Sequence, residues 1–130
     1  MLQTKPELIR IKKAREMKLI NAIQEQKLNI IAVDFDGTLC ERKRFPQIGE
    51  PKMELIEWLK EQRANGTKLI LWSCRENEDL SAAVQWCEKY DLLFDAINEN
   101  VPSCGLKTRK VVADLYIDDR ACVPIYEEDK

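Results

Sequence analysis

Two carboxylates at the end of a short apolar segment have the spacing of a cation-binding site. Asp34 and Asp36 directly follow the apolar run 30–33, and Gly37 and Thr38 come next. Such a run is typical of a strand buried on both faces, and acids at its carboxyl end lie where open α/β sheets bind ligands. Massed carboxylates need a cation, and their hard oxygen atoms suit Mg²⁺. For this segment alone, a strand that ends in an ordinary Asp-Gly turn is the alternative.

The absence of histidine narrows the chemistry further. The 130 residues include none, which excludes Ser-His-Asp and Cys-His nucleophile systems, HExxH zinc sites and histidine general bases. Any catalysis must therefore use carboxylates, lysine or a metal ion.

Charge and hydropathy argue against a broadly nucleic-acid-binding protein and against a membrane protein. Of 21 basic and 23 acidic residues, seven basic and three acidic lie in 1–27, so 28–130 carry a net charge of −6. This acidic body lacks the basic face that broad nucleic-acid binding requires. No run approaches eighteen apolar residues and the N-terminus has no signal-peptide core, so we expect a cytoplasmic protein with no membrane partner.

The cysteines fit neither a zinc ribbon nor a redox pair, because their number is odd and no two are three residues apart. We expect reduced thiols, most of them serving as small buried hydrophobic side chains. The five are Cys40, Cys74, Cys87, Cys104 and Cys122.

Apolar periodicity and turn residues predict alternating helices and strands. The expected helices cover 5–27, 51–64 and 79–90, and the expected strands cover 30–33, 68–72, 94–97 and 115–117. The segments 40–50 and 98–110 contain proline and glycine and should be loops, the second with a helical turn near 106–109. This alternation indicates an α/β fold with a parallel sheet of about four strands and right-handed crossovers. We expect an N-terminal helix within 1–28, packed on or beside a catalytic domain of 29–130.

Residues that follow parallel strands converge at one edge of the sheet, even when they lie far apart in the sequence. Here that edge would collect carboxylates, a hydroxyl group and a lysine. The residues that follow strands are Asp34, Asp36, Ser73, Asp118 and Asp119, and Lys110 lies in the loop that leads into the last strand. The combination suits phosphoryl transfer, because a metal and a lysine neutralise phosphate charge, a hydroxyl donates to a phosphoryl oxygen, and a carboxylate can attack.

These residues resemble, in order, the four motifs of the haloacid dehalogenase-like (HAD) phosphohydrolases. The motifs are Asp34-Phe35-Asp36-Gly37-Thr38-Leu39, Leu69-Ile70-Leu71-Trp72-Ser73, Lys110 and Ile117-Asp118-Asp119. The resemblance covers about 29–120, and segments 71–75, 97–100 and 114–121 are similar to a subgroup of very small bacterial and phage phosphatases. It implies a three-layer Rossmann-like sandwich without a cap domain, Mg²⁺ as cofactor, and an aspartyl-phosphate intermediate.

The resemblance also implies a role for each acid. Asp34 would be the nucleophile, and Asp36 would protonate the leaving oxygen and then accept a proton from water. The family's dehalogenases lack the second acid, so Asp36 indicates phosphate esters. Asp34, the backbone carbonyl of Asp36, and Asp118 or Asp119 would bind the metal, with Asp118 the expected direct ligand and Asp119 bound directly or through water.

Four residues are expected to contact the phosphoryl group: Ser73, Lys110, Gly37 and Thr38. For some of these residues, a role other than phosphate binding is the alternative. Taken alone, Ser73 is more typical of a turn or cap, and Thr38 is as typical of a turn cap as of a residue that orients Asp36. Lys107 is the alternative to Lys110. Arg75 could contact the substrate, or form a surface ion pair with Glu76 or Glu78.

No segment has room for a cap domain, because 40–50 allows only a flap and 97–110 is short. An open mouth suits a bulky phosphorylated substrate, such as a macromolecular end, or a homodimer whose neighbour supplies the lid; a phosphorylated small molecule is the alternative. The basic run 41–44 in the flap could hold an anionic substrate or be a solvated loop.

Two other functions would also place acids on a parallel sheet. A receiver-type phosphoacceptor domain predicts paired acids after the first strand and a lysine after the last, whereas here paired acids follow the last expected strand and the lysine precedes it. A regulatory protein that binds a phosphoryl ligand with little or no turnover is the stronger alternative, since no motif reports a rate.

Overall fold

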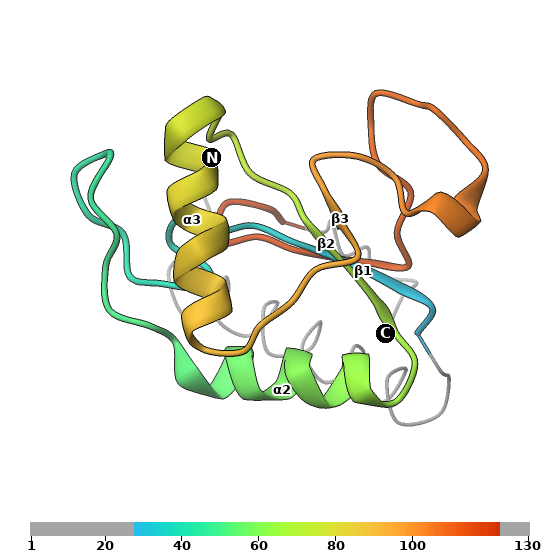
Figure 1. Cartoon of the computed structure of the whole chain (residues 1–130), viewed down its shortest axis with the longest axis horizontal. Helices are drawn as coiled ribbons and strands as arrows, with labels where there is room; N and C mark the ends of the chain where they lie inside the picture. The colour runs from blue at the N-terminus through green and yellow to red at the C-terminus, as the bar shows by residue number, and fades with distance from the viewer. Residues whose placement is uncertain (1–27, 123–130) are drawn as a thin grey trace, which may run out of the picture. The chain divides into compact units, whose positions relative to one another are not determined.

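A parallel four-stranded sheet forms the centre of the structure, a computed structural model that describes residues 28–122. Its strands are β1 (Ile30–Val33), β2 (Lys68–Leu71), β3 (Ala96–Ile97) and β4 (Leu115–Ile117), in the order β3-β2-β1-β4 (Figure 1). The predicted α/β class and the four parallel strands are confirmed. The helix predicted over 5–27 lies outside the described residues.

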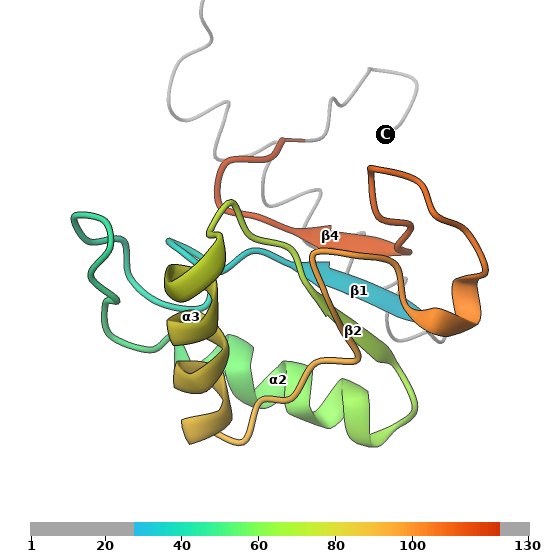
Figure 2. The same cartoon turned by 45° about the horizontal axis from the view of Figure 1, so that its top comes forward.

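Both α-helices pack against one face of the sheet (Figure 2). They are α2 (Met53–Ala64) and α3 (Asn77–Lys89). The fully buried side chains that join them to the strands are Ile31, Val33, Ile56, Leu59, Leu69, Leu71, Ala83 and Cys87. Alternate strand positions thus face the helices, as the two-residue period of a strand requires.

The helices differ from the prediction only at their ends. α2 begins at Met53 rather than at 51, because Pro51 pairs with Cys40 at the base of the flap 40–50. It ends at Ala64, as predicted, with Asn65 as its C-cap and Gly66 following at a φ of +101°. α3 begins two residues earlier than predicted and has two acidic residues in its first turn, where the helix dipole favours negative charge.

The other face of the sheet is covered by the chain that connects β3 to β4. Val101 and Val111 of this connection pack on Ala32 and Ile70. Its helical turn is a 3₁₀ segment at Pro102–Cys104, not near 106–109 as predicted, because Pro102 suits a first helical position and Gly105 ends the turn at a φ of +73°. Within residues 28–122 this layer contains no α-helix, so the third layer of the predicted sandwich is not helical in this part of the chain.

The strand order reverses between β1 and β4. The chain moves from β1 to β2 to β3 in one direction and then returns across the opposite face to place β4 on the other side of β1. Such a reversal opens a crevice at the carboxyl ends of the two strands, where α/β sheets bind their ligands. Pairing of Val33 with Ile117 brings these ends together, and the N–H of Asp34 donates to the Ile117 carbonyl at 2.9 Å.

The opposite end of the β1–β4 pair is held by a side chain. Asp114 Oδ2 accepts hydrogen bonds from the backbone N–H groups of Asn29 (2.9 Å) and Ile30 (2.8 Å). This contact fixes the start of β1 against the start of β4. It therefore helps to set the alignment that brings Asp34 beside the residues after β4.

The five cysteines are all free thiols, as predicted. Only Cys40 and Cys87 are buried, so the expectation that most would be core residues is wrong: Cys74 and Cys122 are exposed. No helix in the described part of the chain is long and apolar enough to cross a membrane.

Replacing Asp114 with Ala should destabilise the fold by about 1 kcal/mol, because two backbone N–H groups lose a charged acceptor at an exposed site where water can replace it. Asp114→Asn keeps one acceptor oxygen and should lose less than half as much. Urea denaturation measures both values, and equal losses in the two variants would contradict the proposed role of the hydrogen bonds.

Candidate active site

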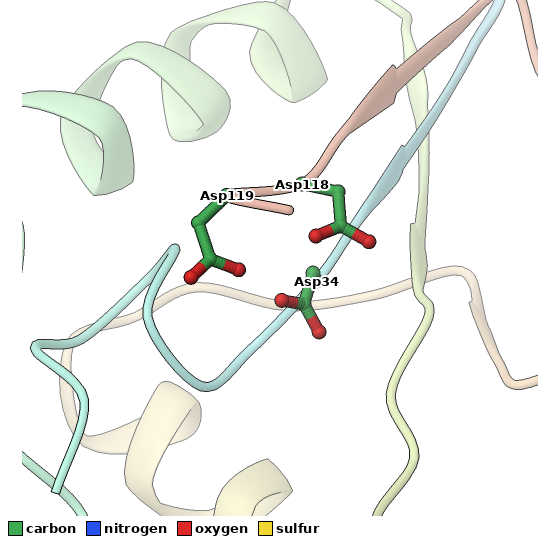
Figure 3. A group of neighbouring side chains, drawn as sticks. All are labelled: Asp34, Asp118 and Asp119. Atoms are coloured by element: carbon green, nitrogen blue, oxygen red, sulfur yellow. The ribbon is translucent and has the colours of Figure 1, made fainter. Parts of the chain in front are cut away.

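Three carboxylates meet at the carboxyl ends of β1 and β4. Asp34 follows β1, and Asp118 and Asp119 follow β4 (Figure 3). One oxygen atom from each lies within 4.8 Å of the others, with Asp34 half-buried and the other two exposed. The sequence predicted that these residues converge, and the structure brings them together.

Gly37 allows the chain to turn back toward this cluster. Its φ of +81° is one that side chains disfavour, and a Cβ atom at this position would collide with the Asp119 carboxylate. The turn is closed by hydrogen bonds from the N–H groups of Thr38 and Leu39 to the Phe35 carbonyl, and Phe35 itself is fully buried. Gly37 thus provides the space that Asp119 occupies.

The Thr38 hydroxyl connects two of the carboxylates. It lies 3.2 Å from Asp34 Oδ2 and 3.4 Å from Asp119 Oδ1, and it accepts a hydrogen bond from the Asp119 N–H at 3.0 Å. Its single hydrogen can be donated to one carboxylate at a time. The contact with Asp36, one of the two roles considered for Thr38 from the sequence, is not formed among the described residues; its partners are Asp34 and Asp119.

Burial and like charge make ionisation of Asp34 costly. The pKa of Asp34 is raised from 3.8 to about 6, mainly by burial and to a smaller extent by the charges of Asp118 and Asp119. Hydrogen bonds from the Phe35 N–H and from Thr38 act in the opposite direction. A cation at the cluster would favour the carboxylate form that a nucleophile or a metal ligand needs.

Arg42 of the flap supplies the positive charge nearest to Asp119. Its Nη2 atom donates to the Asp36 carbonyl at 3.1 Å and to Asp119 Oδ2 and Oδ1 at 3.1 and 3.3 Å. Burial raises the pKa of Asp119, but the hydrogen bond and charge of Arg42 outweigh this effect and hold the pKa below its ordinary value. The sequence placed the basic run 41–44 near the mouth without indicating which member would reach the acids.

The Asp36 carboxylate makes its contact with Arg75. Its two carboxylate oxygens accept hydrogen bonds from Nε and Nη2 of Arg75, both at 2.8 Å. The Arg75 side chain is only 2% exposed. The surface ion pair with Glu76 or Glu78, considered from the sequence, is not formed among the described residues.

Arg75 also holds the flap. Its guanidinium donates to the carbonyls of Pro46 (3.2 Å) and Gln47 (3.3 Å) and lies over the rings of Phe35 and Phe45 at 5.3 and 5.1 Å. These contacts hold the flap and Asp36 together, and the predicted contact of Arg75 with a substrate stays a prediction. The sequence gives little indication of the ion pair between Arg75 and Asp36, because the two residues lie 39 positions apart.

Ser73 lies in the turn that follows β2. Its Oγ accepts a hydrogen bond from the Arg75 N–H at 3.1 Å, as in a serine turn, and its N–H donates to Asn98 Oδ1 at 2.8 Å. Asn98 follows β3 with a φ of +53°, a conformation that asparagine tolerates. Asn98 thus positions the Ser73 turn, a role that sequence reasoning missed.

The predicted phosphate lysine is not brought to the carboxylates. Lys110 is exposed, and its Nζ lies over the Tyr116 ring, 5.2 Å from its centroid. The connection that carries it extends past the end of the sheet where β1 and β4 begin (Figures 1 and 2). Lys107 is exposed and makes no hydrogen bond or ion pair through its side chain among the described residues.

The residues at the cluster fit a divalent cation. Three carboxylates lie close together, and a guanidinium nitrogen of Arg42 brings a positive charge to the Asp36 carbonyl and Asp119. Hard oxygen ligands of this kind suit Mg²⁺. Asp34, Asp118, Asp119 and the Asp36 carbonyl are the groups that would hold it.

Comparison with known proteins identifies a structural relative. The solved structure of a conserved protein from Bacteroides thetaiotaomicron matches with 43% sequence identity and a TM-score of 0.67, over 77% of this chain and 84% of that chain. No protein-family model matches the sequence, and no curated protein does.

Changing Asp34 to Asn should stabilise the metal-free protein at neutral pH. Folded Asp34 keeps its proton up to about pH 6, whereas the unfolded chain releases it near pH 3.8. The free energy of unfolding therefore falls as pH rises through this window, and the amide avoids the loss. We expect a gain of roughly 1–2 kcal/mol at pH 7, allowing for the solvent screening of a half-buried group.

Urea denaturation with a chelator present measures this gain, and the gain should largely vanish at about pH 3, where Asp34 is mostly protonated in both the folded and the unfolded chain. A gain of equal size at both pH values would show that packing, not ionisation, is responsible.

Proposed function

The chain belongs to the same family as the conserved Bacteroides thetaiotaomicron protein, and from its own site we propose that it is a Mg²⁺-dependent phosphatase that hydrolyses phosphate monoesters. The observation that carries this proposal is the cluster of Asp34, Asp118 and Asp119 at the point where the strand order reverses. It agrees with the HAD-like motifs in which these three acids occur.

Asp34 is the nucleophile in this proposal. One of its oxygens attacks phosphorus, the bond to the ester oxygen breaks, and an aspartyl-phosphate forms on Asp34. Thr38, which touches Asp34 Oδ2, orients the attacking carboxylate. Bound Mg²⁺ would lower the charge repulsion between the carboxylates and the phosphoryl group. Water then hydrolyses the aspartyl-phosphate and restores Asp34.

Asp36 is the proposed proton carrier. It gives a proton to the leaving oxygen and takes one from the hydrolytic water. The hydroxyl hydrogen of Ser73 can donate to a phosphoryl oxygen, because the Ser73 contact with Arg75 uses the oxygen as an acceptor. Gly37 gives the Asp119 carboxylate room beside the site, and Lys110 would need a rearrangement of its connection to reach the phosphoryl group.

One observation favours a second function. The Asp36 carboxylate is held by Arg75 rather than turned toward the Asp34 cluster. If this ion pair persists when a phosphoryl ligand binds, the acid has no access to the leaving group, and the protein would bind the ligand with little or no turnover. That regulatory function is the alternative.

We further propose a HAD-like core without a cap domain. Among the described residues, the flap 40–50 lies in the segment that follows the carboxyl end of β1, and the connection 98–114 follows the carboxyl end of β3. The substrate is a phosphorylated small molecule or a phosphorylated macromolecular end, which an open site admits. A homodimer, in which a neighbour covers the site, would serve the same purpose as a cap.

Asp34→Asn should abolish the hydrolysis of p-nitrophenyl phosphate with Mg²⁺, lowering kcat by more than about 10³-fold, because the amide is not a nucleophile. Its circular dichroism spectrum should match that of the wild type. A chelator should remove wild-type activity, and Asp118→Asn with Asp119→Asn together should do the same. Retained turnover in Asp34→Asn would rule out the covalent mechanism, and chelator-insensitive activity would rule out the metal.

Asp36→Asn should affect substrates according to their leaving group. Alkyl phosphates need a proton on the leaving oxygen and should lose about 10²–10⁴-fold in kcat/KM, whereas p-nitrophenyl phosphate, whose leaving group needs none, should lose about tenfold or less. Parallel steady-state assays make the comparison.

Arg75→Lys is the matched control, since it disturbs the ion pair between the Arg75 guanidinium and Asp36 but keeps the Asp36 carboxylate. It should lower both activities equally. Equal losses for the two substrates in Asp36→Asn would favour an orienting role for Asp36, and no turnover of either substrate by the wild type would favour the regulatory alternative.

A further inference from the structure

Arg42 occupies a position that a metal ion would need. A single nitrogen, Nη2, contacts the Asp36 carbonyl at 3.1 Å and Asp119 Oδ2 at 3.1 Å. Both are groups that would bind Mg²⁺ under the proposed function. A cation bound directly to both oxygens would need the space that this nitrogen fills between them, and the two positive charges would repel each other.

The cluster needs a counter-ion before a metal arrives. Asp34, Asp118 and Asp119 have oxygens within 4.8 Å of one another, and among the described residues Arg42 forms the one ion pair with any of them. Without Arg42, the metal-free protein would hold three carboxylates that repel one another.

The flap can release this guanidinium without losing its own structure. The backbone next to Arg42 is fixed by the hydrogen bond from the Glu41 N–H to the Glu50 carbonyl at 2.8 Å. The Arg42 side chain, in contrast, is 43% exposed and can turn into water. Exchange therefore requires a change of side-chain rotamer rather than movement of the loop.

We propose that Arg42 is a built-in substitute for the metal ion: it neutralises the carboxylates while the site is metal-free, and Mg²⁺ must displace it from the Asp36 carbonyl and Asp119 to bind. The inference rests on the proposed function for the existence of the metal site. It assigns Arg42 a regulatory role, because the strength of its contacts sets the Mg²⁺ concentration at which the site fills.

Two measurements on Arg42→Ala should change in opposite directions. The metal-free variant should unfold at a lower temperature than the wild type, because the carboxylates lose their counter-ion. The same variant should bind Mg²⁺ about tenfold more tightly in isothermal titration calorimetry, because no hydrogen-bonded guanidinium has to leave. With saturating Mg²⁺ the difference in melting temperature should disappear.

Arg44→Ala and Arg120→Ala are the matched controls. Each removes one positive charge, from the same flap or from beside Asp119, without emptying the position that Arg42 holds; the Arg44 side chain forms no ion pair among the described residues. Both should bind Mg²⁺ within about twofold of the wild type at an ionic strength of about 0.5 M, where long-range charge effects are screened.

The outcomes separate this proposal from the metal site itself. Tighter binding in Arg42→Ala alone supports the exchange. Equal Mg²⁺ affinity in the wild type and Arg42→Ala, with binding lost in Asp119→Asn, overturns the role of Arg42 and leaves the metal site standing. Tightening of equal size in all three arginine variants also overturns it, since net charge would then explain the effect. No Mg²⁺ binding by the wild type or Arg42→Ala overturns both proposals.

Discussion

Repulsion among carboxylates at the paired ends of β1 and β4 is the constraint to which the rest of the site responds. Strand pairing fixes where Asp34 and Asp118 must lie, because Val33 is opposite Ile117. The backbone cannot separate these charges without breaking the sheet. Nearby groups therefore offset them: the Thr38 hydroxyl between two carboxylates and the Arg42 guanidinium on the exposed side. Half-burial of Asp34 makes the problem more severe.

The strands and the acid cluster could be predicted because both follow from general rules of parallel sheets. The run 30–33 is apolar at every position, so both the burial of this strand and the residue at which it ends could be predicted. Strand β4 also begins and ends at the predicted residues. Convergence of Asp34 with Asp118 and Asp119 then follows, because parallel strands share one carboxyl edge. No side-chain detail was needed for this part of the prediction.

Contacts that depend on the path of a loop were not predictable in the same way. The place of Lys110 before the last strand and its match to a HAD motif suggested that it would reach the site, but its connection runs past the opposite end of the sheet, and the side chain lies on Tyr116. The partners of Arg42 and Arg75 depend on how the flap folds back over the strand ends. Sequence patterns specify the period of an element, whereas the direction of an irregular segment is set by packing that involves the whole domain.

Arg75 couples the flap to Asp36, the proposed proton carrier, because it contacts both. The same guanidinium holds Asp36, the carbonyls of Pro46 and Gln47, and the ring of Phe45, which is itself 60% exposed. A molecule that presses on Phe45 or lifts the flap would strain the ion pair and free the acid. Selection of the substrate and delivery of the proton would then be a single event. A change in flap sequence that altered the range of substrates would also alter the timing of the chemistry.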